Sequence, residues 1–220
     1  MEPISGHAGI AVPLPLSDIN TDLIYPQQFL RKPDRDAMGE FLFYSLRYKP
    51  DGTPDPDFIL NREPYDAATI LIAGRNFGSG SSREHAPWAL KAYGFRCLIS
   101  SMFADIFKAN CVNNGIIPVT VGDADLAECL RAAENPQDAR FAVDLETREL
   151  THARLGTLKF NIGDSDRDRL LEGRDLISDA LAEIDAVEAH EARSAAGAPW
   201  LDLAGAPGGR DRCGGRHGGR

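Results

Sequence analysis

The stretch from residue 69 to residue 134 constrains the fold most, because short apolar runs alternate there with segments of helix-forming residues. The predicted elements are strands at 69–73, 97–100 and 116–121 and helices near 86–93, 103–113 and 123–134. Strands that alternate with helices usually pair in parallel and are joined by right-handed crossovers. We therefore expect an α/β protein built around a mainly parallel sheet.

The flanking segments are less regular. Residues 9–16 contain two prolines and are predicted to form an edge strand, because proline damages a central one. Apolar and polar residues alternate over 141–145, and 155–162 resembles a partner strand, so a small antiparallel element is expected. Residues 44–57 hold three prolines, a glycine and three aspartates without a period, which predicts a loop excursion.

The C-terminal part of the chain is predicted to contain helices near 166–172 and 180–193, followed by a tail rich in Gly, Ala, Arg and Pro. At 220 residues and 43% hydrophobic composition, the chain is long enough for one sizeable core. We expect one domain over residues 1–195 and a disordered tail over 196–220.

Charge and composition argue against several classes of protein. The formal net charge is -9, and no basic stripe with interleaved aromatic residues is found, which disfavours nucleic-acid binding. No apolar run of about 18 residues occurs, and the N-terminus lacks a basic segment followed by an apolar one, so a cytoplasmic protein without a membrane anchor is expected. The four cysteines, Cys97, Cys111, Cys129 and Cys213, form no C-x-x-C pair and are predicted to be reduced thiols that bind no metal.

Residues 74–90 carry most of the chemistry of the chain. They read Gly-Arg-Asn-Phe-Gly-Ser-Gly-Ser-Ser-Arg-Glu-His-Ala-Pro-Trp-Ala-Leu and follow the first predicted strand of the regular stretch. The carboxyl end of a strand is where open α/β sheets bind ligands. Free backbone N–H groups and the positive end of the next helix, reinforced by Arg83, predict an anion site.

The segment fits other known motifs less well. Ser81 and Glu84 match the capping box S-x-x-E, but Pro87 would then stand at the sixth helical position, where proline disrupts a helix. The helix is instead predicted to begin at Ala86 or Pro87. The loop lacks the lysine of a P-loop and the G-x-S-x-G order of a nucleophile elbow. His85 is either a base or ligand, or a structural, hydrogen-bonded residue.

Residues 76–90 resemble the signature of the small subunits of 3-isopropylmalate dehydratase, a family of the aconitase superfamily. Segments 18–30, 102–110 with 114–118, and 185–193 agree with that family in the same order, so the resemblance covers about residues 8–195. Ser79 stands where the family usually has Cys. Residues 44–57 and the chain beyond 200 match nothing in the family pattern.

This resemblance implies a swivelling β/β/α three-layer domain with a mainly parallel sheet and a small antiparallel β element. It also implies a heteromeric hydro-lyase of leucine biosynthesis, which converts 2-isopropylmalate to 3-isopropylmalate through 2-isopropylmaleate. In such an enzyme the [4Fe-4S] cluster belongs to a large subunit. This chain is then expected to bind no cofactor, to form a heterodimer or heterotetramer, and to be inactive alone.

The resemblance also assigns roles to individual residues. Ser81 is implied to be the proton-abstracting base, and Ser82 and Arg83 are implied to hold a substrate carboxylate. Thr21 and Asp22 are implied to face the shared site.

The loop over residues 26–31 is the segment to which the family's substrate choice is attributed. Phe29 and Leu30 either line an apolar pocket for the branched side group or pack in the core. Two other functions stay open from the residues: a paralogous hydro-lyase for an acid of the dimethylmalate, citraconate or homoaconitate type, and a non-catalytic anion-binding module.

Overall fold

The structure, a computed structural model, describes residues 1–31, 34–174, 181 and 183–197. The chain divides into two compact units, residues 1–175 and 176–220, which are described separately. In the second unit, the helix predicted near 180–193 is α8 (Ile184–Gly197), which extends two residues into the predicted tail. Residues 198–220 of that tail lie outside the described residues. The domain boundary at residue 195 stays a prediction.

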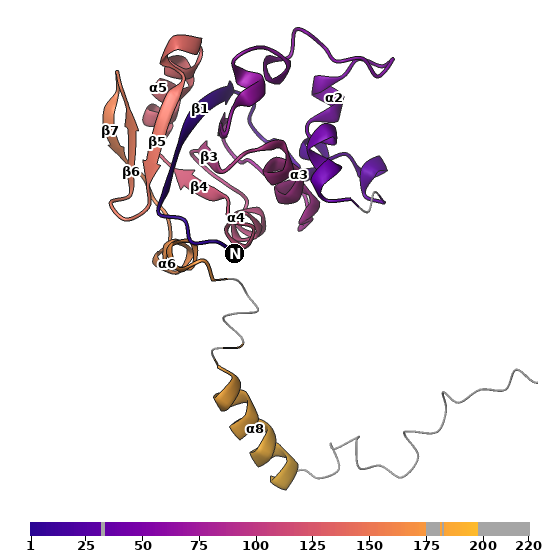
Figure 1. Cartoon of the computed structure of the whole chain (residues 1–220), viewed down its shortest axis with the longest axis vertical. Helices are drawn as coiled ribbons and strands as arrows, with labels where there is room; N and C mark the ends of the chain where they lie inside the picture. The colour runs from indigo at the N-terminus through magenta and orange to yellow at the C-terminus, as the bar shows by residue number, and fades with distance from the viewer. Residues whose placement is uncertain (32–33, 175–180, 182, 198–220) are drawn as a thin grey trace, which may run out of the picture. The chain divides into compact units, whose positions relative to one another are not determined.

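The first unit is built around one seven-stranded sheet with the strand order β4-β3-β2-β1-β5-β6-β7 (Figure 1). Its strands are β1 (Gly6–Leu14), β2 (Ile70–Ala73), β3 (Cys97–Ser100), β4 (Ile117–Thr120), β5 (Arg140–Asp144), β6 (Glu149–His152) and β7 (Gly156–Lys159). Strands β1 to β4 pair in parallel, and β1, β5, β6 and β7 pair in antiparallel fashion. The predicted α/β class is confirmed, and the antiparallel element continues the parallel sheet.

The prediction that the N-terminal strand lies at an edge is wrong, because β1 is central. Its first half pairs with β5 and its second half, from Ala11 on, pairs with β2. The N–H of Ala11 donates to Ala139 O at 2.7 Å. The nitrogen of Pro13, two residues later in the strand, faces the same side as that N–H. It lies past the last residue of β1 that pairs with β5. A proline is tolerated there because the position has no ladder hydrogen bond to lose.

Helices connect the parallel strands as the alternation predicted. The α-helices of the first unit are α1 (Thr21–Ile24), α2 (Tyr44–Arg47), α3 (His85–Tyr93), α4 (Asp105–Asn113), α5 (Asp123–Ala133) and α6 (Asp164–Glu172). Helices α3, α4 and α5 follow β2, β3 and β4, respectively. The predicted excursion 44–57 begins with α2 and continues into a turn that an isolated bridge between Tyr48 and Pro54 closes.

The antiparallel element has one strand more than predicted. Strand β6 lies between β5 and the segment 155–162, which therefore pairs with β6 and not with β5. The side chains of Leu150 and His152 in β6 are buried although the strand is short and partly polar. This alternation is too brief to stand out in the sequence.

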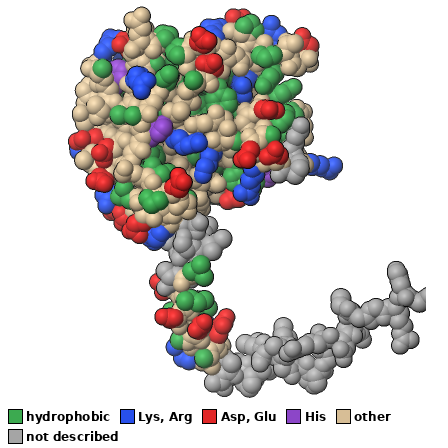
Figure 2. All heavy atoms as spheres, viewed as in Figure 1, with side chains coloured by type: hydrophobic (Ala, Val, Ile, Leu, Met, Phe, Trp, Pro, Cys, Tyr) green, Lys and Arg blue, Asp and Glu red, His purple; other side chains and the backbone are tan. Residues whose placement is uncertain are grey.

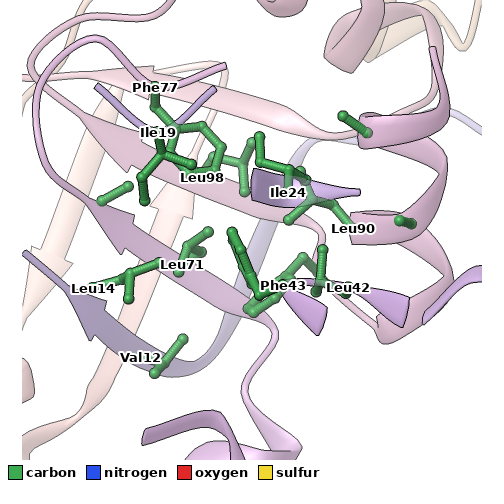
Figure 3. Packing of buried hydrophobic residues seen from close by; sticks show 14 of the residues in the cluster. Val12, Leu14, Ile19, Ile24, Leu42, Phe43, Leu71, Phe77, Leu90 and Leu98 are labelled. Carbon is green, nitrogen blue, oxygen red and sulfur yellow. The ribbon is translucent and has the colours of Figure 1, made fainter. Parts of the chain in front are cut away.

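Alternate residues of the parallel strands build two separate cores, one on each face of the sheet. The aromatic face is defined here by the cluster that includes Val12, Leu14, Leu71 and Leu98, together with Phe43, Phe77, Phe95 and Phe107. The aliphatic face is defined by the cluster that includes Ala11, Ile70, Ile72, Ile99 and Val119 with residues of α5 and α6. Figure 3 shows the aromatic face, where Ile19, Ile24 and Leu90 close over the strands.

Candidate active site

The segment between β2 and α3, residues 74–84, is called the bend. Its backbone pairs with the segment that follows β1: Gly78 N–H donates to Ile19 O at 2.7 Å, and Thr21 N–H donates to Ser79 O at 2.9 Å. The two segments meet because β1 and β2 are neighbouring parallel strands, whose carboxyl ends lie at the same edge of the sheet. The sheet thus brings residues 19–22 beside the serines of the bend.

Close packing beneath the bend requires glycine at two positions. Gly78 has φ +82°, and a Cβ built there would lie 2.1 Å from the ring of Phe107 in α4. Gly80 has φ +97°, and its Cβ would lie 3.2 Å from the Cβ of Asn20. Side chains other than hydrogen would be strained in this left-handed region and would also collide. The glycines therefore let the bend lie directly on α4 and on the chain after β1.

The start of α3 bears on the capping-box alternative for Ser81 and Glu84. Helix α3 begins at His85, one residue before the predicted start, and Pro87 stands at its third position. Glu84 occupies the N-cap position with helical φ and ψ, and within the described part of the chain no side chain makes a capping hydrogen bond there. Ser81 precedes the helix by four residues, and its hydroxyl is engaged elsewhere. A capping box is not formed.

The hydroxyl groups of Ser81 and Thr21 are in contact, with Oγ and Oγ1 2.5 Å apart. Thr21 is 2% exposed and is the first residue of α1, whose N-cap Asn20 accepts a hydrogen bond from Leu23 N–H at 2.8 Å. Ser81 is half-buried. Because Thr21 is buried, water competes little for its hydroxyl, and the Ser81 side chain is held in one orientation.

A second pair in the bend is ionic. Arg83 Nη1 donates to a carboxylate oxygen of Asp22, the residue after Thr21, and the two side chains are 27% and 53% exposed. Ser82 is exposed, and its carbonyl oxygen accepts a hydrogen bond from Asn110 Nδ2 at 3.4 Å. The structure therefore gathers all five residues predicted from the two segments. They form a hydrogen-bonded pair of hydroxyl groups and a partly exposed ion pair at the carboxyl edge of the parallel strands.

Comparisons with known proteins place this arrangement in a family. The family model of the aconitase C-terminal domain matches residues 1–124. Two relatives are named 3-isopropylmalate dehydratase small subunit. The one from Sinorhizobium fredii is 47% identical over 192 residues, which is 87% of this chain and 96% of the relative. The one from Brucella canis is 42% identical over 200 residues, which is 91% of this chain and 100% of the relative.

The chain belongs to the family of 3-isopropylmalate dehydratase small subunits. A crystal structure of 3-isopropylmalate dehydratase from Methanocaldococcus jannaschii has the same fold, with a TM-score of 0.60 and 24% identity. That match covers 84% of this chain and 99% of the archaeal one. The family and the fold that residues 76–90 suggested are confirmed.

In this family member, Phe29 and Leu30 are half-buried and pack against the core of the aromatic face. The ring of Phe29 stacks on Phe41 with centroids 4.4 Å apart and meets Tyr44 edge-on at 4.8 Å. Its carbonyl oxygen accepts a hydrogen bond from the Tyr25 hydroxyl at 3.1 Å. These contacts are those of packing, and a substrate-lining role for Phe29 and Leu30 stays a prediction.

His85 lies between two rings that the sequence analysis did not single out. It stacks on Tyr25 with centroids 6.2 Å apart and meets Trp88 at 4.9 Å. Burial, then the charges of Arg83 and Arg35, lower the pKa of His85, and Glu84 opposes them. Its neutral imidazole serves packing, which favours the structural interpretation. The helical spacing of His85 and Trp88 was the available signal.

The cysteines do not supply a cluster site in the described chain. Cys97, Cys111 and Cys129 are free and buried. Burial raises the pKa of all three thiols, to about 12 for Cys129, where Asp125 and Glu128 add to it. Cys213 lies outside the described residues. Among the residues described, no group of three or more His, Cys, Asp or Glu side chains is placed to hold a metal ion.

Over the described ranges, the structure contains no helix that is both long and apolar enough to cross a membrane.

Proposed function

We propose that this chain is the small subunit of a 3-isopropylmalate dehydratase, a hydro-lyase that converts 2-isopropylmalate to 3-isopropylmalate through 2-isopropylmaleate in leucine biosynthesis. Two findings support the proposal: the identity to proteins of that name over most of both chains, and the contact between Ser81 and the buried Thr21 at the open edge of the sheet. The second finding supports the chemistry, because the contact with Thr21 orients the Ser81 hydroxyl that is proposed to act as the base.

In this proposal Ser81 removes a proton from the substrate carbon next to the one that bears the hydroxyl group. A serine hydroxyl ionises far above neutral pH, and each unit of pKa depression requires about 1.4 kcal/mol of selective stabilisation of the anion. The Thr21 hydroxyl can donate to the Ser81 oxygen at 2.5 Å, and the Arg83 charge and the N–H groups of the bend add to the stabilisation. A positioned base contributes about 10²- to 10⁴-fold to a rate.

Arg83 and Ser82 are proposed to bind a carboxylate of the hydroxy-dicarboxylate substrate. A guanidinium has five donors, and the contact with Asp22 leaves others for a bidentate pair. Asp22 would orient Arg83 at the opening of the site, beside the Thr21 hydroxyl.

Phe29 and Leu30 are proposed to contribute the apolar wall for the branched group of the substrate. One methylene in such a wall is worth about 1 to 3 kcal/mol, so discrimination against shorter acids would be moderate.

A [4Fe-4S] cluster is proposed to lie on a large subunit that completes the site. When bound, it supplies a Lewis acid for the substrate hydroxyl. The buried thiols of this chain, with their raised pKa values, do not fit the role of cluster ligands. The task of this chain in the complex is then to bind the carboxylate, to position the substrate and to move the proton at Ser81 Oγ.

Co-expression with a cluster-bearing large subunit tests the proposal. Ser81→Ala should lower kcat for 2-isopropylmalate by about 10²- to 10⁴-fold while the two subunits still co-purify. Ser79→Ala is the matched control, since it removes a hydroxyl from the same bend, and it should retain activity close to that of the unmodified complex. Full activity of Ser81→Ala would refute the assignment of the base, and failure to form any complex would refute the subunit role.

A substrate panel separates this reaction from related ones. The complex should turn over isopropylmalate faster than dimethylmalate, citraconate or homoaconitate-type acids. A reversed order would identify a paralogous hydro-lyase. Tight binding of malate-type acids by the isolated chain, without activity in any complex, would identify a non-catalytic anion-binding module.

A further inference from the structure

The amino edge of the parallel strands, opposite the bend, carries a second group of charged side chains. Arg96 directly precedes β3, and Gly115 lies just before β4. A hollow of about 670 Å³ at this edge is lined by residues 1–7, Lys91, Arg96 and Gly115. A second hollow of about 420 Å³ is lined by Arg35, Asp36, Trp88 and again by Lys91 and Arg96. The two hollows therefore share a pair of cations.

These cations are held in place by hydrogen bonds to the backbone. Arg96 Nη1 donates to the carbonyl oxygens of Lys91 and Phe95, both at 2.9 Å, and Lys91 Nζ donates to Asn114 O at 2.7 Å. One nitrogen of the guanidinium and one hydrogen of the ammonium suffice for these contacts. Nε and Nη2 of Arg96 and the other hydrogens of Lys91 stay available to a ligand.

Two carboxylates lie near these cations, Glu2 in the first hollow and Asp36 in the second, but neither forms an ion pair with them among the described residues. Lys91, Arg96 and Arg35 all lack an ion pair there, although the chain has 33 acidic and 24 basic residues. Arg35 instead lies over the ring of Trp88, 3.7 Å from its centroid. Figure 2 shows Lys and Arg side chains gathered near the middle of one face, beside a histidine. Cations that form no ion pair on an acidic protein are suited to binding an anion.

The environment of Lys91 agrees with this geometry. Burial lowers its pKa first, the charge of Arg96 lowers it further, and Glu2 opposes both. The two cations therefore repel each other in the free chain, and an anion between them would relieve that repulsion. Gly115 lies close to Lys91 in this wall: a Cβ built there would be 3.9 Å from Lys91 Nζ.

We propose that Lys91 and Arg96 form a binding site for a small dianion, either a phosphate monoester or a dicarboxylate. The guanidinium offers a planar pair of donors to two oxygens, and the ammonium adds a point charge from α3. The site is distinct from the bend because it lies before the strands, whereas Ser81 lies after them. A bound anion would join the N-terminal segment to the end of α3, the helix that starts at the bend.

Calorimetry of the full chain tests the site, with inorganic phosphate and malate titrated separately at constant ionic strength. At least one of them should bind saturably. Lys91→Gln should weaken that binding about tenfold, because it removes a charge-assisted hydrogen bond. Lys49→Gln, at an exposed lysine elsewhere, is the matched control and should leave binding unchanged. Glu2→Gln removes the opposing charge and should tighten binding two- to threefold.

The outcomes separate the ligand sources and the two sites. Binding of phosphate alone would identify the phosphate-monoester class, and binding of malate alone the dicarboxylate class. Saturable binding of neither would overturn the proposal. It would also fail if Lys91→Gln and Lys49→Gln weakened binding equally, or if Arg83→Gln abolished binding that Lys91→Gln left intact. Because Glu2→Gln predicts a gain, it tests the site even if Lys91→Gln disturbs folding.

Discussion

The aromatic and aliphatic faces of the parallel sheet bury the same strands in different ways. On the aliphatic face, small and β-branched side chains such as Ile70, Ile72 and Ile99 pack against the regular helices α5 and α6. On the aromatic face, residues of α3 and α4 together with rings and short irregular segments cover Leu71 and Leu98. Regular helices need only an apolar stripe to pack. Irregular segments pack only where particular side chains fit one another, and the residues of the proposed active site lie in such segments.

This difference explains how the proposed active site is positioned. Ser81 is placed by a backbone that lies on Phe107 and by the buried hydroxyl of Thr21, so its geometry depends on the packing of the aromatic face. The aliphatic face contributes stability without touching the bend. Mutations of equal cost on the two faces should therefore differ in their effect on activity.

The largest effect is expected from Gly78→Ala. A Cβ there would lie 2.1 Å from the Phe107 ring, at a residue with φ +82°. The overlap and the strained backbone together should lower the free energy of unfolding by about 3 to 4 kcal/mol, measured by urea denaturation. Gly156→Ala, at the first residue of β7, is the control: its φ is +71°, and no described atom lies within 4 Å of the added Cβ, so about 1 kcal/mol is expected. Equal losses would show that the bend does not rest on α4.

A matched pair of phenylalanines compares the two faces directly. Phe77, on the aromatic face, meets Phe107 edge-on at 5.4 Å, and Phe141, on the aliphatic face, stacks on His152 at 4.4 Å. Phe77→Leu and Phe141→Leu should each lower the free energy of unfolding by about 1 to 2 kcal/mol. In the complex with a large subunit, only Phe77→Leu should lower kcat, by about tenfold, because the bend shifts. Equal kcat values for the two variants would contradict the inference that only the aromatic face positions the bend.

Thr21→Val should separate chemistry from stability. Valine keeps the shape of threonine but leaves the Ser81 hydroxyl without its partner, at a cost of about 1 kcal/mol in stability. Turnover of the complex should fall about tenfold, and the ascending limb of its pH–rate profile, which reports ionisation of the base, should move to higher pH because the Ser81 anion loses a donor. Thr157→Val on the exposed strand β7 should change neither quantity. An unshifted profile would restrict Thr21 to a packing role.

The smallest effect concerns the pH dependence of stability. Burial and nearby arginines hold the pKa of His85 below its ordinary value of 6.5, so the unfolded chain binds the proton more readily. Stability from this group is complete above pH 6.5 and is lost as the pH falls toward the lowered pKa. His85→Phe keeps the ring contacts and should flatten this decline, measured by urea denaturation at several pH values. His7, whose pKa is also lowered by burial and by Arg96, should account for a remaining slope.

The sequence predicted the regular helices and strands better than the irregular segments that cover part of the aromatic face, for a physical reason. Helices α3, α4 and α5 and the strands between them follow periodic patterns that depend on neighbouring residues. The region from residue 15 to residue 68 has no such period, since its 3₁₀ turns and single helical turns are stabilised by contacts with distant rings. The strand β6 and the central place of β1 depend likewise on pairings that no local pattern contains.

The candidate site was predictable in outline only. The place of the bend between strand and helix followed from its glycines and Pro87, and the anion site predicted there from Arg83 stays a prediction. That Ser81 and Thr21 belong to one site was expected only from the resemblance to a family, because no local pattern links residues 60 positions apart. Their hydrogen bond required the structure. The rings of Tyr25 and Trp88 around His85 and the contact of Gly78 with Phe107 required the structure.

The central position of β1 has a consequence for how the protein comes to be made. This strand is synthesised before the other strands of the sheet, and its partners β2 and β5 begin only at Ile70 and Arg140. The middle of the sheet therefore stays open until more than half of the chain has been synthesised, and such distant pairings form slowly. During that interval the apolar strand must avoid other partners. A nascent chain of this protein should depend on chaperones until β5 closes the sheet.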